Sequence, residues 1–203
     1  LYINDLATEI KSLNKGIDID SINVSILLYA DDIVLLGPSE ASLQCMLDCV
    51  NAWCHKWRLS INCSKSNVIH FRPSSVERST FNFFCGSHSL VYVDSYKYLG
   101  IWFSEHVTWN KTVKELSKSA SRALSCLTVK FYAYGGMTYQ VFTKLYESLV
   151  QPILLYGASI WGLTEHRLIN NVQNRASKIF LGVTKLTSNT AVQGDLGWLS
   201  CHA

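Results

Sequence analysis

Long hydrophobic runs are missing from this chain of 203 residues. No apolar run reaches the ~18 residues of a membrane-spanning helix, because Asp31 and Asp32 interrupt the longest candidate. The first residues also lack the basic-then-apolar order of a secretory signal. We therefore expect no membrane association and an intracellular location, in the cytoplasm and nucleus. The chain begins with Leu1 rather than Met, so we expect a part of a longer protein.

Several motifs of metal sites and enzymes are missing as well. The sequence has no Cys-x-x-Cys pair, no His-Glu-x-x-His, no glycine-rich phosphate loop and no Gly-x-Ser-x-Gly. Structural zinc sites usually contain a close cysteine pair. We therefore expect no zinc, and we interpret the seven cysteines as reduced, mostly buried thiols. The potential zinc ligands that we considered are Cys45, Cys49, Cys54, His55 and Cys63.

Charge is distributed unevenly along the chain. Residues 1–110 hold 8 Lys and Arg against 11 Asp and Glu, whereas residues 111–203 hold 10 against 4. An acidic half favours cation binding and a basic half favours polyanion binding. The two halves are therefore expected to have different roles.

The hydrophobic pattern changes from mixed to helical near residue 105. Alternating apolar residues over 22–28 and an apolar run over 33–36 predict a hairpin, and Ser39 predicts the cap of a helix. Short strands follow, among them one strand over Tyr96 to Phe103. Beyond 108 the spacing predicts helices alone, one of which runs from Ile153 to Trp161. The expected fold class is α+β, with an appended helical part.

Asp31 and Asp32 are the most informative residues. No Lys or Arg occurs between Lys15 and Lys56, so no sequence neighbour neutralises the two carboxylates. Two like charges on an apolar hairpin repel each other, and a divalent cation relieves this repulsion; hard oxygen ligands suit Mg²⁺. The alternative is a solvated turn, in which Asp is common.

The sequence Tyr29-Ala30-Asp31-Asp32 between apolar strands resembles the catalytic hairpin of reverse transcriptases. Other segments resemble polymerases of non-LTR (LINE-like) retrotransposons, and they occur in the order of that family. They are Leu1 to Leu6, Trp57 to Asn62 with Lys65-Ser66, Tyr96 to Ile101, Leu155-Tyr156-Gly157, Asn174-Arg175-Ala176 and Gly197-Trp198-Leu199.

The resemblance implies an RNA-directed DNA polymerase that works by two-metal nucleotidyl transfer. Asp31 and Asp32 would be ligands of two Mg²⁺ ions, and Lys65 would act catalytically beside the triphosphate. Tyr98, Leu99 and Gly100 would lie near the primer terminus. Lys65 can equally be a surface lysine, and Leu99-Gly100 a buried strand with a close backbone approach. The implied partners are an RNA template with a DNA primer, and deoxynucleoside triphosphates.

The resemblance also implies a division of the chain. Residues 1–105 would be the C-terminal part of the polymerase palm, an antiparallel hairpin sheet with helices. Residues 106–150 would be a helical thumb and 151–203 a helical connector. A further metal-binding aspartate and the fingers would precede Leu1, so we expect the fragment alone to be inactive and apolar surface to be exposed beside the hairpin. Alternatives are a non-catalytic nucleic-acid-binding remnant and a decayed fragment without a stable fold.

A basic stripe is predicted on the first helix of the basic half. Its members recur every three or four residues: Lys111, Lys114, Lys118 and Arg122. One interpretation is a solvated helix face. The other is a thumb helix that contacts the phosphates of the template–primer duplex.

Overall fold

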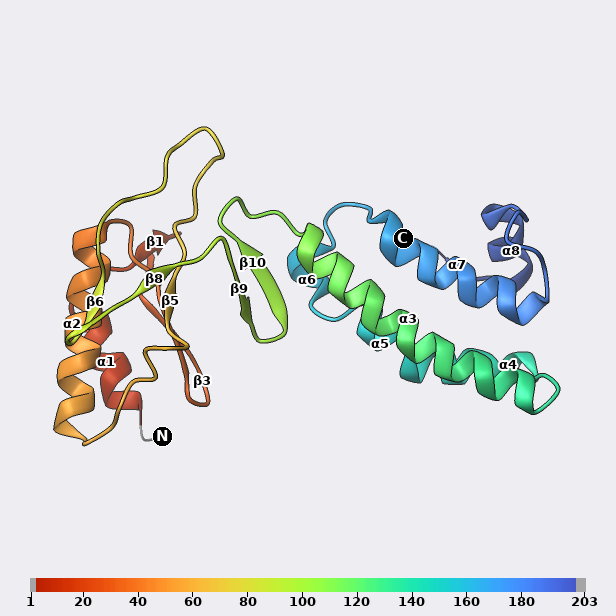
Figure 1. Cartoon of the computed structure of the whole chain (residues 1–203), viewed down its shortest axis with the longest axis horizontal. Helices are drawn as coiled ribbons and strands as arrows, with labels where there is room; N and C mark the ends of the chain where they lie inside the picture. Colours follow the sequence, from red (N-terminus) through yellow and green to blue (C-terminus); the bar gives the residue numbers. More distant parts are fainter. Residues whose placement is uncertain (1–2, 200–203) are drawn as a thin grey trace. The chain divides into compact units, whose positions relative to one another are not determined.

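The computed structural model describes residues 3–199 and has the expected α+β class. The chain divides into two compact units, Leu1–Tyr96 and Lys97–Ala203, which are described here one at a time (Figure 1). The division into palm, thumb and connector stays a prediction, because the contacts separate only these two units.

Two helices form the core of the first unit. They are α1 (Asn4–Ser12) and α2 (Glu40–Lys56). The predicted cap of α2 is confirmed, since the Ser39 side chain accepts a hydrogen bond from the Ser42 backbone N–H at 3.3 Å. Fully buried Leu6 and Ile10 of α1 pack with Met46 of α2. Trp57 follows the last turn of α2 and is 44% exposed.

The strands of the first unit pair two by two. β1 (Ile17–Ile19) pairs with β2 (Ile22–Val24), and β3 (Ile26–Tyr29) pairs with β4 (Asp32–Leu35), both antiparallel. β5 (Asn67–Val68) runs parallel to β8 (Val91–Tyr92), and β6 (Phe84–Cys85) is antiparallel to β7 (His88–Ser89). The predicted hairpin is confirmed as β3–β4, but its first strand is shorter than the expected 22–28, because Ile22–Val24 pair with β1 instead. β5, β6, β7 and β8 span two residues each, in agreement with the short strands expected after α2.

A hairpin stands where a single strand was predicted from Tyr96 to Phe103. β9 (Ser95–Tyr98) crosses the boundary between the units and pairs with β10 (Ile101–Ser104). Leu99 and Gly100 connect them with φ angles of +46° and +87°. Positive φ at both central residues reverses the chain, which a continuous strand cannot accommodate.

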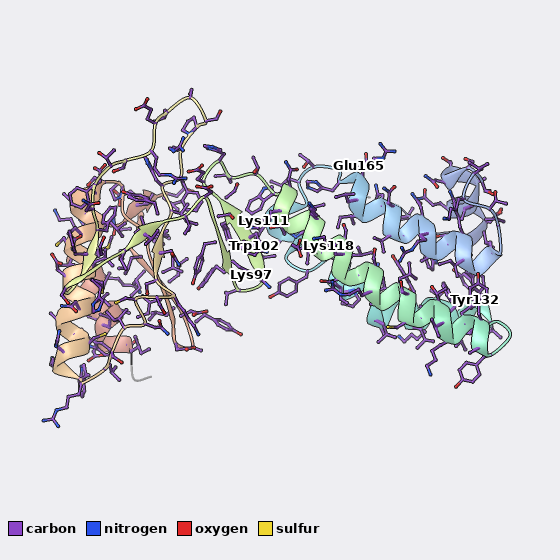
Figure 2. All side chains as sticks on the ribbon, viewed as in Figure 1. Lys97, Trp102, Lys111, Lys118, Tyr132 and Glu165 are labelled. Carbon is purple, nitrogen blue, oxygen red and sulfur yellow. The ribbon has the colours of Figure 1, made fainter. Side chains whose placement is uncertain are left out.

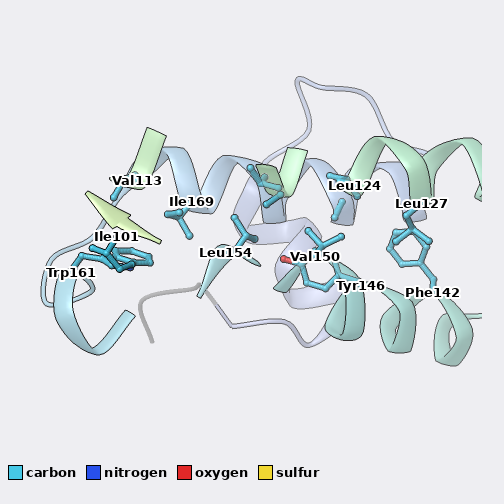
Figure 3. Close-up of a cluster of buried hydrophobic side chains, with 13 residues drawn as sticks. Ile101, Val113, Leu124, Leu127, Phe142, Tyr146, Val150, Leu154, Trp161 and Ile169 are labelled. Atoms are coloured by element: carbon cyan, nitrogen blue, oxygen red, sulfur yellow. The ribbon is translucent and has the colours of Figure 1, made fainter. Parts of the chain in front are cut away.

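The second unit is built on the long helix α3 (Asn110–Ala133), which packs against α4 (Tyr139–Leu149), α5 (Gln151–Leu154) and α7 (Arg167–Leu181). The chain ends in α8 (Asn189–Leu196), which packs on α7. Side chains from α3, α4, α5, α7 and β10 meet in one hydrophobic core (Figure 3). α7 ends where Gly182 follows it with φ +67°, a conformation that commonly terminates a helix.

The helix predicted from Ile153 to Trp161 is broken into α5 and α6 (Ala158–Trp161). Gly157 causes the break with φ +65°. A Cβ at Gly157 would lie 2.7 Å from Ile101 Cδ1. The break therefore brings the backbone of this segment against β10.

The described cysteines are less buried than predicted. Cys54 and Cys85 are buried, Cys49 and Cys63 are half-buried, and Cys45 and Cys126 are exposed. Burial raises the pKa of Cys85 to about 11, so its thiolate is scarce at neutral pH. Cys201 lies outside the described residues. Within residues 3–199 no helix has the length and apolar character to span a membrane.

Candidate functional site

The turn of the β3–β4 hairpin carries both aspartates. Tyr29 pairs with Asp32, so Ala30 and Asp31 form a two-residue connection. Ala30 has φ +52°, a left-handed conformation that costs an L residue energy. Strain of this kind is concentrated at functional sites. Asp31 and Asp32 are both exposed, so their carboxylates are accessible to solvent and to a ligand.

The hairpin is anchored on one side only. Ile26 is buried, and Ile33 and Leu35 pack against the core that α1 and α2 form. On the opposite face of the hairpin, Leu27 is 43% exposed and Tyr29 is 62% exposed. The apolar surface expected beside the hairpin is therefore present on β3.

Two neighbouring carboxylates fit a magnesium ion in part. Magnesium is usually held by one or two carboxylates, while water and substrate phosphates complete its shell. Within the described part of the chain, no group of three His, Cys, Asp or Glu side chains is placed to hold a metal ion. Asp31 and Asp32 could therefore supply some of the ligands of such a site.

Lys65 lies in an exposed, well-defined turn of the first unit. Its backbone N–H donates to the Asn62 carbonyl at 3.0 Å. Its own carbonyl accepts hydrogen bonds from Tyr96 Oη at 3.1 Å and from Asn67 Nδ2 at 3.2 Å. These bonds fix the backbone and leave the ammonium group at the surface, so both interpretations of Lys65 stay open.

Leu99 and Gly100 form the tip of the β9–β10 hairpin and lie in the second unit. Leu99 is 38% exposed, so the alternative of a buried strand is wrong. A close approach to Gly100 does exist, but it is made by the Tyr156 ring: a Cβ on Gly100 would lie 2.9 Å from Tyr156 Cε1. Tyr98, the third residue of the predicted primer-terminus segment, is half-buried at the end of β9.

The four members of the basic stripe occupy exposed positions of α3 (Figure 2). Lys111 Nζ lies 3.4 Å from the centroid of the Trp102 ring, in a cation–π contact. Lys118 Nζ lies 2.8 Å from Glu115 Oε1, and this hydrogen bond lowers the pKa of Glu115. Arg122 donates to Ser119 Oγ at 2.9 Å.

The stripe remains basic despite these contacts, since Glu115 is the one acidic residue of α3. Lys111 and Lys114 lie near the N-terminus of α3, where the helix dipole is already positive. An anion close to this end would relieve the repulsion among these charges. The geometry therefore suits phosphate contacts.

Sequence reasoning gave no role to two side chains that hold β10. Thr112 Oγ1 accepts from the Trp102 N–H at 3.0 Å and donates to the Trp102 carbonyl at 2.8 Å. Tyr156 Oη donates to the Leu99 carbonyl at 2.8 Å. A threonine in the first turn of a helix and a tyrosine before a glycine are common, so only the fold reveals these contacts.

The family described as "Reverse transcriptase (RNA-dependent DNA polymerase)" matches residues 1–103. This range contains the Asp31-Asp32 turn, Lys65 and the β9–β10 tip. No solved structure gives a significant match.

Curated relatives match most of the chain. "Probable RNA-directed DNA polymerase from transposon BS" of Drosophila melanogaster is 28% identical over 83% of the chain and 20% of its own length. "RNA-directed DNA polymerase from mobile element jockey" of Drosophila funebris is 25% identical over 77% of the chain and 18% of its own length. "Retrovirus-related Pol polyprotein from type-1 retrotransposable element R1" of Nasonia vitripennis is 24% identical over 90% of the chain and 59% of its own length. The chain thus spans about a fifth of the first two relatives.

Proposed function

This chain belongs to the reverse transcriptase family and, within it, to the polymerases of non-LTR retrotransposons; from this we propose that it supplies part of the catalytic centre of an RNA-directed DNA polymerase. The observation that carries the proposal is the apolar β3–β4 hairpin, which presents two exposed carboxylates at a strained turn. The substrates of the intact enzyme are then a DNA primer on an RNA template, and deoxynucleoside triphosphates.

Asp31 and Asp32 hold magnesium in this proposal, because they are adjacent carboxylates on a short, rigid turn. Two bound ions would supply charge stabilisation at the reacting phosphorus and activation of the primer 3′-hydroxyl. The strands of the hairpin fix the separation of the carboxylates. Lys65 neutralises charge on the triphosphate from its turn.

We further propose that residues 1–105 belong to the palm, 106–150 to the thumb and 151–203 to a connector. The exposed face of β3 at Leu27 and Tyr29 supports this, because apolar strand surface is normally covered by a neighbouring element. In the intact polymerase the covering element would be a palm strand that also carries the further aspartate.

The 203 residues alone are expected not to extend a primer, because no third carboxylate joins Asp31 and Asp32 among residues 3–199. The test incubates the purified chain with an RNA template, a DNA primer, Mg²⁺ and nucleotides, while a longer polypeptide of the same polymerase is the positive control. Extension by the longer polypeptide alone agrees with the proposal. Extension by the 203 residues would refute the predicted inactivity, and failure of both would refute the polymerase assignment.

Replacing Lys114 and Arg122 with Ala is expected to weaken binding to an RNA–DNA duplex and to flatten its salt dependence. Each lost phosphate contact reduces the magnitude of the slope of log K against log salt concentration by ~0.9. The slope of the double variant should therefore be smaller by about 2. Lys144→Ala with Lys185→Ala is the matched control, since it removes the same charge from exposed positions elsewhere in the second unit. Equal slopes for the two double variants would leave α3 as a solvated helix face.

A further inference from the structure

The tip of the β9–β10 hairpin requires external support. Leu99 has φ +46°, a left-handed conformation that is unfavourable for an L residue with a side chain. Leu99 is also 38% exposed, so its own side chain is only partly packed. A strained, partly exposed turn keeps one position only when neighbouring groups hold it.

Tyr156 supplies this support directly. Its hydroxyl donates to the Leu99 carbonyl at 2.8 Å. Its ring lies against Gly100, where a Cβ would come within 2.9 Å of Cε1. One side chain therefore contacts both residues of the turn.

Tyr156 is itself fixed by the core of the second unit. Its carbonyl accepts a hydrogen bond from Trp161 Nε1 at 2.8 Å, and Trp161 is 3% exposed. The adjacent Gly157 places its backbone against Ile101, which is also 3% exposed. Tyr156 is 49% exposed, so its ring and hydroxyl contact the tip at the surface while core residues hold its backbone.

β10 itself is held by a side chain of α3. Thr112 is 1% exposed and bonds both backbone groups of Trp102, as a neighbouring strand would. The tip and β10 thus take their positions from Tyr156 and Thr112, which follow them in the chain. The family match extends to residue 103 and so includes the tip, whereas Thr112 and Tyr156 lie beyond it.

We propose that Tyr156 is a positioning residue for the primer terminus: it fixes the Leu99–Gly100 tip, and the tip contacts the 3′ end of the primer. This inference rests on the proposed function and on the resemblance to the family, which implies that Tyr98, Leu99 and Gly100 lie near the primer terminus. Tyr156 acts only through the tip. It follows that removing its hydroxyl should affect recognition of a primer end more than general duplex binding.

The test compares Tyr156→Phe with Tyr139→Phe. Tyr139 is a matched control, because its hydroxyl also donates to a backbone carbonyl, that of Leu196, at 2.8 Å and its side chain is 45% exposed. Binding of the chain is measured by fluorescence anisotropy to two RNA–DNA duplexes, one with a recessed DNA 3′ end and one blunt. Hydrogen exchange of the peptide that covers residues 98–102 reports the tip itself.

The parent chain and Tyr139→Phe should bind the recessed duplex more tightly than the blunt one. In Tyr156→Phe the ratio of the two affinities should fall about fivefold, which is the usual effect of losing one neutral hydrogen bond. Tyr156→Phe should keep its affinity for the blunt duplex and exchange faster over 98–102. Unchanged preference in Tyr156→Phe, or equal losses in both variants, would overturn the inference. Duplex binding without any preference in the parent would also overturn it but spare the proposed function, whereas no duplex binding at all would count against both.

Discussion

Asp31→Asn is expected to lower the rate of primer extension by about a hundred- to a thousandfold in a polymerase polypeptide that carries this segment. The substitution removes the negative charge of a metal ligand while keeping its size. A bound metal contributes several kcal/mol of transition-state stabilisation, and each ~1.4 kcal/mol corresponds to a factor of ten in rate. Asp31 is exposed, so the loss should occur without loss of stability.

Asp20→Asn is the control for this experiment. Asp20 is also an exposed aspartate in the turn of a hairpin, with φ +44°, but it belongs to β1–β2. Steady-state primer extension and thermal melting are measured for both variants. A loss below about fivefold in Asp31→Asn, or an equal loss in Asp20→Asn, would contradict the assignment of Asp31 as a metal ligand.

Phe142→Ala is expected to destabilise the second unit by ~3–5 kcal/mol, the usual cost of emptying a large buried aromatic site. Phe142 is completely buried in this core (Figure 3). Its ring centroid lies 5.4 Å from that of Phe131 and 5.0 Å from that of Phe180. The resulting cavity would lie among α3, α4 and α7, which all contribute side chains to this core. The measurement is urea unfolding followed by circular dichroism.

Tyr134→Ala controls for the loss of an aromatic side chain in the same unit. Tyr134 is 74% exposed, so its removal should change the free energy of unfolding by less than ~0.5 kcal/mol. Similar losses in the two variants would mean that Phe142 does not pack in the core as described.

Helices could be predicted well from the sequence wherever apolar spacing was regular. The α3 face with Val113, Ala120, Leu124 and Leu127 is buried as its spacing indicated. Long helices bury a continuous stripe, so their pattern is visible in the sequence alone. The β3–β4 hairpin was predictable for a similar reason, because two apolar runs enclose a short polar turn.

Two chain reversals could not be predicted in the same way. The β9–β10 turn places Leu99 at positive φ. Leucine rarely adopts this conformation, so its presence in the sequence does not predict a turn. The break at Gly157 depends on contact with Ile101, a residue distant in sequence. Both reversals are set by tertiary packing of the second unit, whereas the sequence pattern reports only local preferences.

The residues of the candidate site also differ in how far the sequence alone could predict them. The type of residue at Asp31, Asp32 and Lys65 was readable from the sequence, and their surface positions agree with the roles proposed for them. The cation–π contact of Lys111 and the support from Tyr156 depend on residues brought together by the fold.

The central claim is that the Asp31-Asp32 turn binds divalent metal, and Mn²⁺ titration of the ¹⁵N-labelled chain tests it most directly. Paramagnetic Mn²⁺ substitutes for Mg²⁺ and broadens the amide signals of residues near the ion, so even weak binding is located. The account predicts that broadening begins at residues 29–33 and is lost when both aspartates are replaced by Asn. Broadening centred elsewhere, or broadening that survives the double substitution, would contradict it.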